Sequence, residues 1–200
     1  MKKTIKAVKT EINEDFEFRI VAGSLKGRVI KAPNLGVTRP PLTRLRKSIF
    51  DFLRPYLEDA HYLDLFSGTG SYLFEAVSRG VTHATGVELE PRLVDSIAMQ
   101  AEKFQVADKI TCICKDAFKA IPLFYKQERK FDIVMIAPPQ YKGIINDTLT
   151  AIKENPILTD EHLILCQHDT SETKHLKFDG YEVLQQRKYG NTTFSVLHLR

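Results

Sequence analysis

The sequence predicts an α/β fold built on a mostly parallel sheet with helices on both faces. From His61 to Ile152, strand-like apolar runs alternate with segments whose apolar residues have helical spacing, which is typical of parallel sheets. Two further strand-like runs, 181–188 and 193–198, flank Gly190 and Asn191, a dipeptide that favours a tight hairpin. We therefore expect this terminal hairpin to add an antiparallel strand to the sheet.

The elements follow in order from the N-terminal side. Residues 19–32 contain two short strand-like pieces around Gly23 and Gly27. Thr43 to Arg54 has apolar residues three and four positions apart, which predicts a helix with Thr43 as its N-cap. The elements expected after this helix are strand 62–66, helix 71–78, strand 83–87, helix 91–104, strand 110–114, strand 131–136, helix 144–152, strand 162–167 and the two hairpin strands.

Length and composition predict one domain. A chain of 200 residues with 43% hydrophobic composition can bury a substantial core, and no linker-like stretch separates a second large unit. We expect residues 1–18 to form a flexible tail, 19–58 a basic extension and 59–200 the main domain. No apolar stretch reaches the roughly 18 residues of a membrane span, so a soluble, cytoplasmic protein without a membrane partner is expected.

Few residues suggest a metal site or a disulfide. The three cysteines cannot all pair, and Cys112 and Cys114 are two positions apart in a strand-like run without a second pair to complete a metal site. The six histidines are scattered without metal-ligand spacing. We therefore expect reduced thiols and no metal.

The net charge of +4 is unevenly distributed along the chain. Residues 19–50 contain eight basic residues and no acidic one. A one-signed surface of this kind favours a polyanion such as RNA, because neutralising phosphates releases counterions. The alternative is a solvated cationic face without a partner. The candidate RNA contacts are Lys26, Arg28, Arg39, Arg44, Arg46 and Lys47.

The ends of the predicted strands carry the residues of a candidate nucleotide site. Asp64 begins a turn containing Gly68 and Gly70, where a ligand can approach the backbone closely. Glu88 ends the next strand, where a carboxylate can accept hydrogen bonds from both ribose hydroxyls. Asp116 follows the third strand, in position to bond an adenine amino group. The full candidate set for the cofactor is Asp64, Phe66, Gly68, Gly70, Glu88, Leu89, Asp116 and Ala117.

A dinucleotide dehydrogenase shares the glycine turn and the ribose carboxylate. Its fingerprint requires a third glycine three residues after the second, and Leu73 occupies that position. The diproline Pro138-Pro139 after the fourth strand cannot donate backbone hydrogen bonds, which leaves carbonyl acceptors for an amino group. Both features favour S-adenosylmethionine as cofactor, and hence methyl transfer.

These motifs resemble the RsmD-type guanine-N2 methyltransferases, which modify a guanine of small-subunit ribosomal RNA. The likeness extends over nearly the whole chain after residue 18. It is carried by residues 19–23, 26–28, 38–40, Arg44, Arg46, Phe50, 64–70, 75–76, 78–80 and Tyr189-Gly190. The resemblance implies a Rossmann-like class I methyltransferase fold with a mostly parallel seven-stranded sheet. It also implies S-adenosyl-L-methionine as cofactor and, as partner, ribosomal RNA in the small subunit or an assembly intermediate. We expect a monomer.

The resemblance assigns the acceptor site to Ala137, Pro138, Pro139, Gln140 and Tyr141. The family pattern is Asp-Pro-Pro followed by an aromatic residue, so Ala137 replaces an acidic side chain and Tyr141 comes one position late. Gln167 is a further departure, at a position that is often acidic in the family. Two readings follow: an active methyltransferase that relies on backbone acceptors, or a catalytically impaired protein that still binds cofactor and RNA during ribosome assembly.

Overall fold

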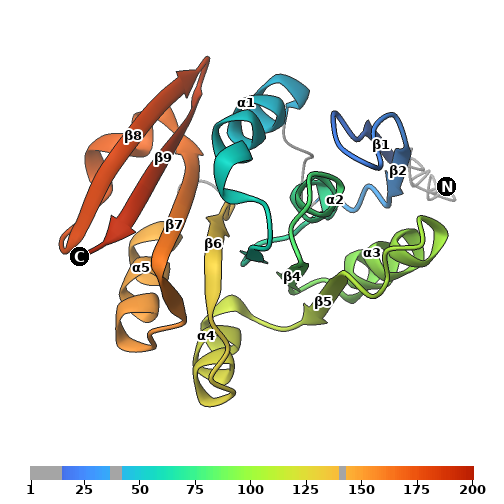
Figure 1. The fold of residues 1–200 in the computed structure, drawn as a ribbon. Coiled ribbons are helices and arrows are strands. Elements are labelled where there is room, and N and C mark those ends of the chain that lie inside the picture. The colour runs from blue at the N-terminus through green and yellow to red at the C-terminus, as the bar shows by residue number, and fades with distance from the viewer. Residues whose placement is uncertain (1–14, 37–41, 140–142) are drawn as a thin grey trace, which may run out of the picture.

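The main sheet has seven strands within the residues that the structure, a computed structural model, describes, namely 15–36, 42–139 and 143–200. Their order across the sheet is β5-β4-β3-β6-β7-β9-β8 (Figure 1). The strands span β3 His61–Asp64, β4 His83–Glu88, β5 Ile110–Cys114, β6 Phe131–Ile136, β7 Leu158–Asp169, β8 Tyr181–Tyr189 and β9 Thr192–Leu199.

Five neighbouring strands, from β5 to β7, run parallel, and β9 runs antiparallel to both β7 and β8. The β8–β9 turn contains Gly190 at φ 59°, a left-handed conformation that glycine adopts without strain. The prediction of a mostly parallel sheet with a C-terminal antiparallel hairpin is confirmed. The chain reverses its direction of travel across the sheet between β3 and β6, and ligands of open α/β sheets bind beyond the strand ends at such a point.

Helices cover both faces of the sheet and divide the core into two layers (Figure 1). One layer packs α1, α2 and α3 against the sheet through side chains such as Phe50, Phe74 and Ile97. The other packs α4 and α5 through side chains such as Phe124 and Leu149. The helices span α1 Thr43–Leu53, α2 Ser71–Ser78, α3 Pro91–Lys103, α4 Ala117–Lys126 and α5 Ile144–Glu154, with short 3-10 helices η1 Arg54–Tyr56 and η2 Thr170–His175.

An N-terminal hairpin of β1 Phe16–Arg19 and β2 Val29–Ala32 packs beside α2 and α3 (Figure 1). The backbone N–H of Ser24 donates to the carbonyl of Ser78 at 2.7 Å, and Ser96 Oγ donates to the carbonyl of Lys31 at 3.2 Å. The predicted tail boundary at residue 18 is therefore wrong, because β1 begins at Phe16. Residues 1–14 lie outside the described part.

Two other expectations are corrected. The sequence analysis did not predict α4, which contains Pro122. Leu42, and not Thr43, occupies the N-cap of α1, and Thr43 is the first helical residue. In the part of the chain that the structure describes, no helix has both the length and the apolar character needed to cross a bilayer.

Candidate active site

The strand order places the predicted cofactor residues at one edge of the sheet. β5, β4, β3 and β6 are consecutive neighbours and parallel, so their C-terminal ends meet at the same edge, which we call the carboxyl edge. Asp64, Glu88 and Asp116 stand at or directly after three of these ends, and Ala137 follows the fourth. The sequence expectation that these positions share one site agrees with this topology.

The glycine turn between β3 and α2 depends on its two glycines. Gly68 and Gly70 have φ values of 50° and 76°, in the left-handed region. A Cβ atom added to Gly70 would lie 2.7 Å from Ile97 Cγ1, so α3 packs directly on the turn. Gly70 is also the N-cap of α2. The turn thus ends at a helix N-terminus, where an anionic or polar ligand group is stabilised.

Glu88 holds this turn against β4 through its carboxylate. Oε2 accepts from the backbone N–H of Gly68 at 2.7 Å, and Oε1 accepts from those of Leu89 and Glu90 at 2.8 and 2.9 Å. A carboxylate has about four lone-pair sites. The three backbone bonds leave one site, on Oε2, for a ligand hydroxyl, whereas the sequence analysis expected Glu88 to serve both ribose hydroxyls.

Asp64 is fully buried beneath the turn. Its Oδ1 accepts from the backbone N–H of Phe66 at 3.2 Å, while Oδ2 has no hydrogen-bond partner among the described residues. The pKa of Asp64 is raised to about 7, mainly by burial; the Phe66 hydrogen bond lowers it and the nearby Glu88 carboxylate raises it. A buried carboxylate oxygen without a partner fits a cationic ligand group such as the ammonium of S-adenosylmethionine.

The segment after β5 provides the N-cap of α4, and an exposed apolar residue follows the neighbouring strand β4. Asp116 is the N-cap of α4, and its Oδ1 accepts from the backbone N–H of Phe118 at 2.8 Å. Ala117 is buried, whereas Leu89 after β4 is 67% exposed. An exposed leucine beside a capped helix start suits the flat apolar face of an adenine.

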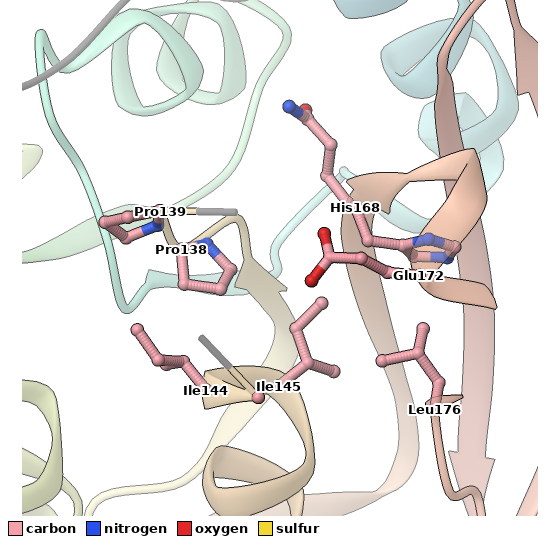
Figure 2. Close-up of a pocket in the computed structure, with 9 residues that line it drawn as sticks. Pro138, Pro139, Ile144, Ile145, His168, Glu172 and Leu176 are labelled. Carbon is pink, nitrogen blue, oxygen red and sulfur yellow. The ribbon is translucent and has the colours of Figure 1, made fainter. Parts of the chain in front are cut away.

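The diproline after β6 borders a pocket at the carboxyl edge. Pro138, Ile145 and His168 line it together with Pro139, Gly143, Ile144, Gln167, Glu172 and Leu176. Figure 2 shows the Glu172 carboxylate pointing into the space between Pro138 and Ile145. Ala137 packs against the core and brings no acceptor to this pocket. The predicted Gln140 and Tyr141 lie outside the described residues.

Tyr72 is a site residue that the sequence analysis missed. Its side chain is buried, and its hydroxyl donates to Oε1 of Gln167, which lines the diproline pocket. Tyr72 therefore fixes the orientation of the Gln167 amide. Its position directly after the glycine turn was the available signal, because the first turn of α2 has to face the carboxyl edge.

The predicted RNA contacts fall into separate places. Arg44 and Lys47 are exposed on α1. The turn that carries Lys26 and Arg28 lies at the C-terminal ends of α2 and α3, whereas Gly70 is at the start of α2. Leu25 N–H donates to Ser78 Oγ at 2.9 Å, and Arg28 lies over the Phe104 ring. Arg39 lies outside the described residues.

Arg46 is corrected as an RNA contact. Its side chain is buried, with a relative exposure of 0%, and its Nη2 donates to the carbonyl of Arg19 at 2.6 Å. A guanidinium enclosed in this way cannot reach a phosphate on a bound RNA. Its position on the buried stripe of α1 is the physical reason.

The strand order, the glycine turn, the Glu88 carboxylate and the diproline at one edge define a class I methyltransferase fold. The chain belongs to the family described as "Conserved hypothetical protein 95", which matches residues 18–198. The resemblance to RsmD-type methyltransferases is thereby confirmed.

Relatives in sequence agree with this family. The Bacillus subtilis protein named "Putative rRNA methyltransferase YlbH" is 30% identical over 182 residues, 91% of this chain and 99% of its own length. The Escherichia coli protein named "Ribosomal RNA small subunit methyltransferase D" is 28% identical over 158 residues, 76% of this chain and 75% of its own.

Solved structures share the fold. The Escherichia coli structure titled "Putative methyltransferase yhhF" superposes with a TM-score of 0.80 at 23% identity, covering 91% of this chain and 97% of that one. The structure titled "SMU.776, a putative methyltransferase complexed with SAH" superposes with a TM-score of 0.70 at 15% identity, over 96% of this chain and 57% of that one. At these identities the likeness concerns the fold alone.

Proposed function

We propose that this chain transfers a methyl group from S-adenosyl-L-methionine to the exocyclic N2 of a guanine in small-subunit ribosomal RNA. The observation that carries the proposal is the unpaired, buried Oδ2 of Asp64 beneath a glycine turn, at the sheet edge that also carries the diproline. The names of the relatives support methylation of ribosomal RNA, and the Escherichia coli name specifies the small subunit.

Residues of the carboxyl edge would hold the cofactor. Asp64 receives the ammonium group, and the remaining lone-pair site of Glu88 Oε2 accepts from a ribose hydroxyl. Leu89 and the start of α4 at Asp116 and Ala117 flank the adenine, while Phe66 and Gly68 border the turn. When bound, S-adenosylmethionine supplies an electrophilic methyl group on a sulfonium. Because β6 is the neighbour of β3, a cofactor held beyond β3 would lie beside the diproline.

The target guanine would lie out of its stack beside the diproline. An exocyclic amine is a poor nucleophile while its lone pair is delocalised into the ring, so acceptors that hold its N–H groups free that lone pair for attack. The carbonyl of Pro138 is one such acceptor. Ala137 provides none, and the loss of one charged acceptor costs roughly 1.5–3 kcal/mol, or about 10- to 150-fold in rate. The proposal is therefore a slow methyltransferase that relies on backbone acceptors.

A protein that binds cofactor and RNA without turnover is the second reading of Ala137. The relatives named as methyltransferases favour turnover over this reading.

The proposal is tested by transfer of labelled methyl from S-adenosylmethionine to small ribosomal subunits that lack the modification, under single-turnover conditions. We expect label in guanine N2 with the native chain and faster labelling with Ala137→Asp. Asp64→Asn is the cofactor-site control and should slow both. Label with Ala137→Asp but not with the native chain would indicate a disabled site in an intact scaffold. No label with the native chain or with Ala137→Asp would contradict the proposal.

A further inference from the structure

A cationic groove lies between α1 and the edge strand β8, apart from the cofactor residues. Arg44, Lys47 and Arg187 line it with Ser48, Asp51 and Phe52. Its volume of about 370 Å³ is within the roughly 300–1,000 Å³ of ligand sites. α1 and β8 are tied together at this place, because the hydroxyls of Ser48 and Tyr189 share a hydrogen bond.

The charges in the groove favour an anion. Three of its side chains are cationic and exposed, and Asp51 is its one carboxylate among the described lining residues. That carboxylate is already engaged by Lys47 and by Arg79 Nη1 at 2.9 Å, and the Lys47 bond is the main reason why its pKa is lowered. The groove therefore keeps a net positive charge from Arg44 and Arg187.

The groove also offers a planar surface. The guanidinium of Arg187 lies over the Phe52 ring, 5.7 Å from its centroid, and Phe52 is itself half-buried against Phe194. Unstacked nucleic acid bases stack on aromatic rings and on guanidinium planes. A site for single-stranded nucleic acid combines cations that contact phosphates with planar groups on which bases stack, and this groove has both. An acidic peptide would need the cations but not the planar surface.

A row of paired residues connects the groove with the diproline pocket. Gln167 on β7 pairs with Phe194 on β9, and Phe194 pairs with Arg187 on β8. Residues paired in this way point to the same face of a sheet, and neighbouring strands are about 4.8 Å apart. The backbone of Arg187 is therefore roughly 10 Å from that of Gln167, a separation that a short RNA segment can span.

We propose that this groove binds the single-stranded ribosomal RNA next to the target guanine. A neighbouring base stacks on Arg187 over Phe52, and Arg44 and Lys47 contact phosphates. The inference rests on the proposed function, and it adds Arg187 and Phe52 to the RNA contacts expected from the sequence.

The test measures binding of the full-length chain to a fluorescent single-stranded transcript of small-subunit RNA, across a salt series and without turnover. Arg187→Gln is expected to weaken binding roughly 5- to 100-fold through loss of the stack. Arg187→Lys keeps the charge but not the plane, so it should weaken binding while leaving the salt slope unchanged. The double variant Arg44→Gln, Lys47→Gln should lower the salt slope by about 0.7 for each lost phosphate contact.

The matched control is Lys126→Gln, which removes an exposed cation from α4 on the other face of the sheet and should leave RNA affinity unchanged. Cofactor affinity and thermal unfolding, measured for every variant, should match those of the native chain. Equal RNA affinity and salt slope in the groove variants and the control would overturn the inference.

Methyl transfer separates this inference from the proposed function. Loss of RNA binding in the groove variants, with no methyl transfer by the native chain, would support the groove while contradicting the activity. Methyl transfer by the native chain with RNA affinity and KM unaltered in the groove variants would overturn the groove alone.

Discussion

The guanidinium of Arg46 and the carboxylate of Glu75 form a fully buried ion pair, with Arg46 Nε 3.5 Å from Glu75 Oε2. Glu75 also accepts from the backbone N–H groups of Val21 and Ala22, at 2.9 and 3.2 Å, and from Arg79 Nε at 2.8 Å. The pair thus joins α1 and α2 to the turn that follows β1. Burial is the main reason why the pKa of Arg46 is lowered, and Glu75 opposes this effect.

The two partners of this ion pair should differ in their importance for stability. Glu75→Gln leaves a buried cation whose Nε and Nη1 already lack hydrogen bonds among the described residues, and it should lower the free energy of unfolding by about 3–5 kcal/mol. Arg46→Met should cost less, because Glu75 keeps Arg79 and two backbone donors. Urea unfolding of both variants checks this order. A larger loss for Arg46→Met would contradict it.

The burial of Arg46 was available in the sequence and was missed. Positions 46, 49, 50 and 53 have the i, i+3, i+4, i+7 spacing of one helix face, so Arg46 lies on the same stripe as Ile49, Phe50 and Leu53. Counting the positive charges of residues 19–50 did not separate this position from the exposed Arg44 and Lys47. The same applies to α4, whose buried Ala117, Ala120, Ile121 and Phe124 have helical spacing that Pro122 obscures.

That Asp64, Glu88 and Asp116 share the carboxyl edge was predictable, because each of them adjoins a strand end in the sequence. Asp64 and Glu88 sit at the ends of apolar runs, and the alternation of strands and helices places those ends together. Only some of the residues that line the diproline pocket were predictable from the sequence. His168 comes from the end of β7, Glu172 from η2 and Leu176 from the position after η2. No motif marks these residues, and only the folded chain brings them to Pro138.

Replacement of Glu88 should disturb both the glycine turn and the cofactor. In Glu88→Gln, the amide NH₂ has to face at least one of the three backbone N–H groups that the carboxylate now accepts. Loss of one charged hydrogen bond of 1.5–3 kcal/mol weakens binding roughly 10- to 150-fold. Calorimetric titration with S-adenosylmethionine measures this change. Glu90→Gln is the matched control, since Glu90 only caps α3 and pairs with Arg92; an equal loss in both variants would count against a specific role for Glu88.

Cofactor affinity should depend on pH through Asp64. Burial raises its pKa to about 7, so the carboxyl group is largely protonated below that pH, and it has to ionise to pair with an ammonium group. Affinity should therefore fall towards tenfold per unit as the pH drops below about 7. Titration between pH 5.5 and 8.5 checks this, with Asp64→Asn expected to bind weakly and without this dependence. A flat profile in the native chain would contradict the assignment.

Folding stability at Asp64 has the opposite sign. A carboxyl group whose pKa is raised by folding contributes stability that is complete below its unfolded value of 3.8 and is lost as the pH rises through about 7. In the absence of cofactor, Asp64→Asn should therefore unfold at higher urea concentration than the native chain at pH 8, and this advantage should shrink towards pH 5. Asp95→Asn, on the exposed face of α3, is the control and should change little. A native chain more stable than Asp64→Asn at pH 8 would show that the buried carboxylate is stabilised by something other than the cofactor.

Acidification should lower the stability of the part of the sheet that contains β7 and β9, because His162 becomes protonated. Nε2 of this buried ring accepts from the backbone N–H of Leu199 at 2.9 Å, Nδ1 lies 2.6 Å from the carbonyl of Thr159, and the ring of His198 stacks on it. Protonation would set an Nε2–H against the Leu199 N–H.

Burial is the main reason why the pKa of His162 is lowered. His198 lowers it further, while the Thr159 bond and Asp160 raise it. A histidine with a lowered pKa gives stability that is complete above its unfolded value of 6.5 and is lost as the pH falls through the folded value. Urea midpoints at pH 7.5 and 5.5 should thus differ more for the native chain than for His162→Gln, in which an amide oxygen can still accept from Leu199. His175→Gln, at an exposed position, should retain the native difference. If His162→Gln also retains the native difference between the two urea midpoints, the loss of stability on acidification arises from another group.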